Sequence, residues 1–510
     1  MAFNKETSND LDDVKLAAHH EDIADIVGLS EEEQVVAKKL VRRIDLLIMP
    51  LVILVYLMNY IDRNNYAAAR LQGLETDLNL QGNQYQTGLA ILFVSYLLTQ
   101  VPSNLFLNYC GRPSLYLGFF VTAWGLVSVL TSQVKGYGGI VACRFILGLV
   151  EAPFFSGALF YLSKWYTQDE LTLRMAIFYS GSLISGAFGN LIAAGILNGL
   201  AGKRGLAAWQ WLYIIEGSIT VFIGLIICAI LPDFPHTWRL LSEQEKHVAN
   251  RRMALEAANA DTDDGKGMSQ LRGLKLAVMD IKTWILAIGY MAMAGAGGFQ
   301  NFFPTLTDTL GYDHIVSLLL VAPPYVFMTF WTYAHGVIAD RCKRPFWYVL
   351  HVSRADHDNR VHHLHELHHL WTAILFLLPR HIHLRHEQHH LQLDRLVHPS
   401  SSSKRAAAFA IINAVGNSAS IWTPYTFTEN QAPYYRTAFG ISLALQILAA
   451  LMGVTLRWVL EVENRRLEKL ENEDAPLSEA DMESLRRTAE IGGIDIAMAR
   501  AQQRGFRYMI

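Results

Sequence analysis

The chain of 510 residues is strongly apolar: 52% of its residues are hydrophobic, 17% are charged, and its mean hydropathy is +0.20. Soluble domains usually carry about 25% charged residues, so this composition excludes a disordered chain and a typical cytosolic enzyme. The net charge of −3 provides no basic field for a polyanion, so we expect no nucleic-acid partner. The composition instead predicts an all-α membrane protein that crosses a lipid bilayer several times.

Six apolar stretches in the first part of the chain are each long enough to cross a bilayer core of roughly 30 Å. They are residues 46–60, 84–107, 115–134, 138–162, 175–197 and 209–231. A polar segment follows at 232–282, in which Ser242 and Glu245 form a capping-box pattern. Four further apolar stretches lie at 284–303, 315–338, 406–427 and 437–460. About ten spans are therefore readable.

Two pairs of matching segments indicate an internal repeat. The segments 108–117 and 340–349 share Cys, Arg, Pro and Tyr in register, and Gly189-Asn190 matches Gly416-Asn417 at a similar offset. Together with the six spans before the polar segment, these matches predict two six-helix halves, a common transporter plan. The predicted organisation is a tail at 1–43, a first half at 44–231, a linker at 232–282, a second half at 283–460 and a tail at 461–510.

The repeat predicts twelve helices, and it places the ninth and tenth near 347–364 and 368–392. The region 350–403 is anomalous there, because 13 of the 19 histidines lie between His351 and His398. Ionisable side chains at this density cannot face a bilayer. A metal-binding loop and a native insertion are alternatives, but we interpret the region as a shifted reading frame or a mispredicted gene segment, because His codons read one base later encode Ile, Met or Thr. A transcript that keeps the His-coding frame would contradict this interpretation.

The sequence contains no motif for an ATP-driven engine, since G-x-x-x-x-G-K-[ST] is absent. Its four cysteines are scattered without a metal-ligand spacing. We therefore expect no enzyme activity, no catalytic residues, no cofactor and no resident metal. Lys and Arg residues gather before the first span, after the eighth and after the last, which predicts that both termini and the linker are cytosolic.

Ionisable residues inside spans are candidates for function because burying them is costly. Asp62 and Arg63 end the first span, and Arg144 and Glu151 lie two helical turns apart on one face of the fourth. An arginine can hold a carboxylate, and a desolvated carboxyl group can load and release a proton. These residues suit a proton-coupled carrier of organic anions. The alternatives are a static ion network and mutual neutralisation of Arg144 and Glu151.

Other polar residues lie in or beside the spans. Glu216 is deeper in the sixth span than a loop residue should be, and either helix pairing or a functional role would explain it. Four amides could line a substrate cavity or join helices by hydrogen bonds: Gln300, Asn301, Asn413 and Asn417. Four charged residues in loops are expected to close a cytosolic gate by pairing with helix ends, or to serve only as membrane anchors: Arg112, Asp340, Arg341 and Arg344.

Five motifs resemble the anion:cation symporter family of the major facilitator superfamily, most of all its fungal branch of allantoate, nicotinate and vitamin permeases. They are the segments at 59–65, 101–104, 144–152, 209–217 and 231–235. The resemblance implies a twelve-helix carrier with alternating access and a central site. It also implies proton coupling at Asp62 and Glu151, and anion binding or gating at Arg63 and Arg144. Asn59, which lies in the first motif, is a further candidate for the substrate site. The loop at 109–112 lacks the acidic residue of the superfamily signature.

We therefore predict a secondary active transporter that couples protons to the symport of a small organic anion. It is expected to be a monomer in the plasma membrane. Export of a fungal secondary metabolite is an alternative within transport. A non-transporting nutrient sensor on the same scaffold is an alternative of a different class.

Overall fold

The computed structural model describes residues 29–261 apart from 111, 236 and 239, residues 270–342 and 402–471, and positions 482 and 486. This part of the chain is helical and contains no strand. The predicted ninth and tenth helices lie outside the described residues.

Six long helices form the N-terminal group, and all six predicted spans are confirmed as helices. They are α2 (Glu31–Leu71), α4 (Gln84–Cys110), α5 (Pro113–Thr131), α6 (Tyr137–Ser163), α7 (Gln168–Leu200) and α8 (Ala208–Ile230), with the short α3 (Leu74–Asp77) and η1 (Lys203–Gly205) in loops. Helix α2 begins well before the predicted boundary at residue 44. Ser30 and Glu33 satisfy its first backbone N–H groups by a reciprocal capping box, which starts the helix in the polar region.

The C-terminal group contains the other four predicted spans. They correspond to the broken helix α11 (Ile281–Ala296), η2 (Gly297–Phe302) and α12 (Phe303–Asp308), to α13 (His314–Cys342), to α17 (Ser402–Asn417) with α18 (Ala419–Trp422) and η4 (Thr423–Thr426), and to α19 (Arg436–Glu471). The loop before α19 holds η5 (Glu429–Gln431). The polar segment is helical rather than a plain linker, with α9 (Glu243–Asp261) and α10 (Gln270–Met279), and Ser242 and Glu245 form the predicted capping box.

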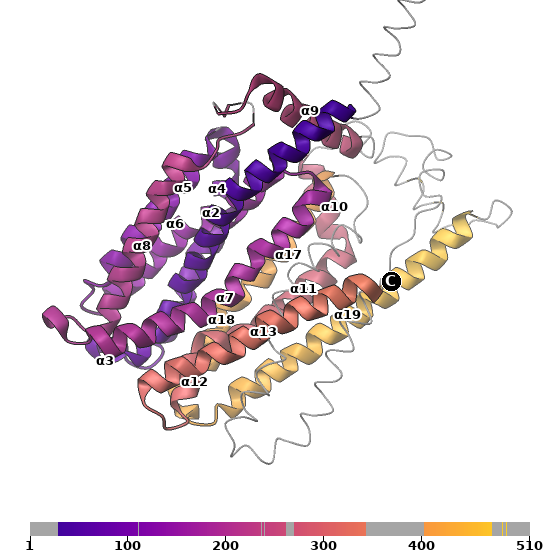
Figure 1. Cartoon of the computed structure of the whole chain (residues 1–510). Coiled ribbons are helices and arrows are strands. Elements are labelled where there is room, and N and C mark those ends of the chain that lie inside the picture. Colours follow the sequence, from indigo (N-terminus) through magenta and orange to yellow (C-terminus); the bar gives the residue numbers. More distant parts are fainter. Residues whose placement is uncertain are drawn as a thin grey trace, which may run out of the picture.

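Seven of the described helices are long and apolar enough to cross a membrane. An eighth span results if α10 and the broken helix α11–α12, which meet at a bend of 71°, count as one. The chain is thus a multi-pass membrane protein. The bundle has two ends (Figure 1). The α9 end carries helix α9 and the start of α2, and the opposite α3 end carries the loop between α2 and α4.

Three apolar cores hold the bundle together. One lies within the N-terminal group around Trp124 and Tyr161. A small one lies within the C-terminal group around Leu286 and Leu456. The remaining core joins the two groups, because residues such as Tyr85 pack with Phe302 and its neighbours. Helices α7 and α13 run side by side at this junction (Figure 1).

Helices α5 and α8 approach each other closely because glycines face glycines. A Cβ atom built at Gly217 would lie 2.8 Å from the backbone nitrogen of Val129 and 2.9 Å from the carbonyl oxygen of Gly125. A Cβ at Gly125 would meet the backbone of Val221 at 2.7 Å. Small residues that let backbones touch are a usual basis of helix association in membranes.

We expect Gly217→Val to lower the stability of the N-terminal group by about 1–3 kcal/mol, because overpacking forces the two backbones apart. The matched control is Gly199→Ala, since a Cβ at Gly199 meets no atom within 4 Å. Thermal unfolding of the purified protein in detergent measures both. Equal midpoints for the two variants would contradict the close approach of α5 and α8.

Candidate substrate and proton site

Arg63 and Glu151 form a buried ion pair in the centre of the N-terminal group. The guanidinium of Arg63 donates from Nε to Glu151 Oε1, and Asn59 Nδ2 donates to the same oxygen at 2.7 Å. The side chain of Glu151 is 1% exposed and that of Arg63 is 18% exposed. The second oxygen, Oε2 of Glu151, is buried and has no hydrogen-bond partner. Helix α2 supplies Asn59 and Arg63 on one face, one turn apart, and helix α6 supplies the carboxyl group.

Three aromatic rings surround the guanidinium of Arg63. Its central carbon lies 4.8 Å from the ring centre of Tyr96, 5.4 Å from that of Tyr60 and 5.8 Å from that of Phe93. Ring faces attract a cation and restrict its movement. The partly exposed edge of Arg63 can therefore receive a flat anion while the rings keep the guanidinium in place.

Arg144 does not pair with Glu151, although both lie on α6. Its Nε donates to the carbonyl oxygen of Gly88 at 3.1 Å, and its guanidinium carbon lies 4.6 Å from the ring centre of Tyr66. Arg144 is only 2% exposed, and its Nη1 is buried without a partner. Arg144 and Glu151 therefore have different partners in this conformation, whereas the alternative of mutual neutralisation would need an ion pair between them.

Asp62 faces away from its neighbour Arg63. It is 1% exposed, and it accepts hydrogen bonds from Trp124 Nε1 at 2.5 Å and from Ser128 Oγ at 3.1 Å. Both donors lie on α5. Consecutive residues of a helix point about 100° apart, which explains why two adjacent charges belong to two different clusters. The sequence showed Asp62 but gave no signal for its partners Trp124 and Ser128.

The four candidate amides belong to the C-terminal group. Gln300 and Asn301 lie in η2, where the broken helix contacts α2, and both are half-buried. Asn417 Nδ2 donates to the backbone oxygen of Asn413 at 3.0 Å and also to its side-chain oxygen. Gln300 and Asn301 therefore lie in a different helix from Asn413 and Asn417, and the last two are joined to each other within α17.

Three of the predicted gating residues, Arg112, Asp340 and Arg341, lie at the α9 end, where α5 begins and α13 ends. Arg112 is exposed, precedes α5 and forms no ion pair with the described residues. The backbone of Asp340 and Arg341 ends α13, but their side chains and all of Arg344 lie outside the described residues. Closure at this end therefore stays a prediction.

Contacts at the α3 end join the two groups and have no signal in the sequence. Arg70 donates from Nε to Glu75 at 2.6 Å and from Nη2 to Glu429 at 2.9 Å, and its guanidinium lies over the ring of Tyr85. Burial raises the pKa of Glu75, while the charge of Arg70 opposes this shift. Gln86 Nε2 also donates to the carbonyl oxygen of Phe427 at 3.0 Å. These bonds hold the groups together at the α3 end.

We expect Glu429→Gln to weaken this closure only slightly. The Glu429 side chain is 60% exposed, and exposed ion pairs contribute about 0–1 kcal/mol, which is at most about a fivefold change in an equilibrium constant. Spin labels on α4 and α18 would report a small rise in the population with a wider α3 end. A complete loss of the closed population would show that this pair dominates the closure.

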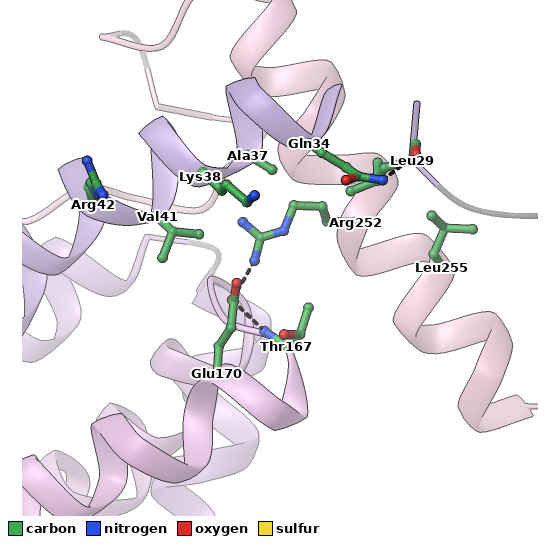
Figure 2. Close-up of a pocket in the computed structure, with 10 residues that line it drawn as sticks. All are labelled: Leu29, Gln34, Ala37, Lys38, Val41, Arg42, Thr167, Glu170, Arg252 and Leu255. Atoms are coloured by element: carbon green, nitrogen blue, oxygen red, sulfur yellow. Dashed lines mark hydrogen bonds and ion pairs between the residues drawn. The ribbon is translucent and has the colours of Figure 1, made fainter. Parts of the chain in front are cut away.

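A separate hollow of about 640 Å³ lies at the α9 end, between α2, α7 and α9 (Figure 2). Arg252 crosses it to Glu170 at 2.5 Å, and Lys38 and Arg42 line it from α2. Nearby, Arg251 pairs with Glu33 at 3.0 Å and Arg43 with Glu245 at 3.5 Å. These ion pairs fix α9 to the N-terminal group and lie apart from the Arg63 cluster.

Comparisons with known proteins agree with this architecture. Residues 52–354 match the model of the Major Facilitator Superfamily. The MFS-type transporter cnsO of Penicillium expansum is 32% identical over 455 residues, which cover 84% of each chain. The pantothenate transporter FEN2 of Saccharomyces cerevisiae is 36% identical over 236 residues, which cover 44% of this chain and 46% of that protein.

A solved structure shares the fold. The crystal structure of a D-xylose-proton symporter superposes with a TM-score of 0.58 at 15% sequence identity, covering 80% of this chain and 96% of that one. The family match, the relative that spans most of the chain and the apolar helices lead to one conclusion. The chain belongs to the Major Facilitator Superfamily, and it is a multi-pass membrane transporter of a small molecule.

Proposed function

We propose that the protein is a proton-coupled symporter of a small organic anion and that Arg63 binds the anion. The observation that carries this proposal is the contact between Arg63 and Glu151, which joins a partly exposed cation to a fully buried carboxylate with one unpartnered oxygen. A buried polar atom without a partner is rare, and here it is the atom that a proton would occupy.

The coupling follows from charge balance. With Glu151 ionised, its carboxylate neutralises Arg63, and a substrate anion would leave an excess negative charge in the core. When a proton occupies Oε2, Glu151 becomes neutral and Arg63 is free to hold the substrate carboxylate. Proton and anion therefore bind together, and they leave together when the site opens to the other side.

The orientation belongs to the same proposal. The α9 end carries the basic residues that flank the spans, so we place it, both termini and the helices α9 and α10 in the cytosol. The contacts at the α3 end then close the outer side of the carrier. We place the protein in the plasma membrane as a monomer, in keeping with uptake from the medium.

The test is uptake of labelled pantothenate, nicotinate and allantoate by vesicles that contain the purified full-length chain. Pantothenate is included because one relative is named for it, and labelled xylose serves as the uncharged control. We expect at least one acid to accumulate when the vesicle interior is alkaline and to lose that accumulation when an ionophore collapses the pH gradient. Uptake that ignores the gradient, or uptake of xylose alone, would contradict the proposal.

A further inference from the structure

Glu216 is the most completely buried carboxyl group of the described residues that the site above does not use. It is 0% exposed, lies mid-way along α8, and both of its oxygens are without a hydrogen-bond partner. An ionised carboxylate in this position would cost many kcal/mol because neither solvent nor a cation compensates it. Glu216 is therefore a neutral carboxylic acid in this conformation, and it carries a proton.

The groups around Glu216 are polar but supply no positive charge at contact distance. Asp62 and Asn65 of α2 face it, and Tyr213 lies one turn away on its own helix. Helix α5 presents Trp124 and Ser128, both of which already donate to Asp62. The charges of Glu151 and Arg144, both on α6, act on Asp62, and the charge of Arg144 also acts on Tyr213. Glu216 and Asp62 thus form a buried pair of carboxyl groups in unequal surroundings.

The inequality assigns one role to each carboxyl group. Asp62 accepts a hydrogen bond on each oxygen, which favours its ionised form, whereas Glu216 accepts none at ordinary hydrogen-bond geometry and only the Asn65 amide acts on it, which favours its protonated form. Two like charges this deeply buried cannot both persist, so the pair holds one proton. The hydroxyl of Tyr213 is also buried without a hydrogen-bond partner among the described residues, which leaves hydrogen-bonding capacity beside the pair for a proton to move.

We propose that Glu216 and Asp62 hold one exchangeable proton as a pair, and that Glu216 is a second proton-carrying group of the transporter. The O–H bond of Glu216 breaks and an O–H bond on Asp62 forms when rearrangement of α5 withdraws the Trp124 and Ser128 donors. The meaning of this proton for transport rests on the proposed proton coupling, but its presence does not.

The test is infrared difference spectroscopy of the purified full-length chain in phosphatidylcholine–phosphatidylglycerol vesicles, with the pH changed between about 5 and 8. We expect a carbonyl band of a protonated carboxyl group that shifts in D₂O and is absent in Glu216→Gln. Asp62→Asn should keep the band and change its pH midpoint, because the neighbouring charge is gone. A merely structural Glu216 would give a band that no pH change and no Asp62 substitution alters, and that result would overturn the proposal.

A second measurement separates this inference from the proposed function. With pantothenate as probe, Glu216→Gln should still exchange label across the membrane, but its gradient-driven accumulation should fall below that of the wild type because one of the two proton-carrying groups is gone. Glu216→Asp, which keeps a carboxyl group, should restore part of the accumulation. If Glu216→Gln accumulates label at the wild-type level in a pH gradient, the role of Glu216 in transport is overturned and the proposed function is not. If the wild-type chain itself ignores the gradient, proton coupling is overturned and the spectroscopic result still stands.

Discussion

Arg63→Met is expected to abolish anion accumulation and to destabilise the N-terminal group. The substitution leaves the carboxylate of Glu151 buried with Asn59 as its sole described donor. Removing one partner of a buried ion pair typically costs about 3–5 kcal/mol, equivalent to a change of more than a hundredfold in an equilibrium constant. Uptake by vesicles and thermal unfolding in detergent measure the two effects separately.

The double variant Arg63→Met/Glu151→Gln distinguishes binding from folding. It contains no unpaired charge at this position, so its unfolding midpoint should return close to that of the wild type, while uptake should stay lost because the cation is missing. Glu151→Gln alone should bind anion without a proton on this residue and should therefore respond less to pH gradients than the wild type. Recovery of uptake in the double variant would show that Arg63 only neutralises Glu151.

Gly186→Leu is expected to force apart the two helix groups at the contact of α7 with α13. A Cβ atom at Gly186 would lie 2.5–2.7 Å from three ring atoms of Tyr325, which is buried and packs near Phe303. A leucine cannot fit there unless the ring moves or the helices separate, and overpacking of this kind costs about 1–3 kcal/mol. Because this contact must form and break if access alternates, we expect transport to fall by about fivefold to more than a hundredfold.

Distances between spin labels on α7 and α13 measure the separation directly. Gly189→Ala, one turn further along α7, is the matched control, since its Cβ would meet Ile61 at an ordinary 3.6 Å. The control should leave both distances and transport unchanged. A Gly186→Leu variant with wild-type distances would show that Tyr325 rotates away and that α7 and α13 tolerate the larger side chain.

The helices themselves were largely predictable. All ten apolar stretches predicted as spans are helical in the structure, and seven or eight of the described helices are long and apolar enough to cross a bilayer. Backbone groups in lipid must be bonded within their own helix, so apolar length predicts a helix. The start of α2 at Glu31 was missed because the helix extends past the apolar region, where Ser30 and Glu33 cap it. The seventh span breaks at Gly297, where the 3-10 helix η2 begins, and this 3-10 geometry was not predicted.

The candidate site was only half predictable, for a physical reason. The cost of burying charge selects Asp62, Arg63, Arg144, Glu151 and Glu216 from the sequence, because each lies inside an apolar stretch. Which of these residues meet is decided by the rotation and packing of three different helices, α2, α6 and α8. Arg63 therefore pairs with Glu151 across α2 and α6, while Arg144, on the same helix as Glu151, turns to Gly88 and Tyr66.

The same division holds at the ends of the bundle. Charge distribution along the sequence determined the predicted orientation, since a sum of basic residues needs no three-dimensional information. The closure of the α3 end by Arg70, Glu75 and Glu429 brings together residues more than 350 positions apart, and the contact of Gly186 with Tyr325 likewise depends on where two helices cross. The sequence by itself determined that the chain spans a membrane and which residues are costly to bury, because hydrophobic burial is non-directional. Only the tertiary structure decided the partners of these residues, because ion pairs and hydrogen bonds require specific atoms at specific distances.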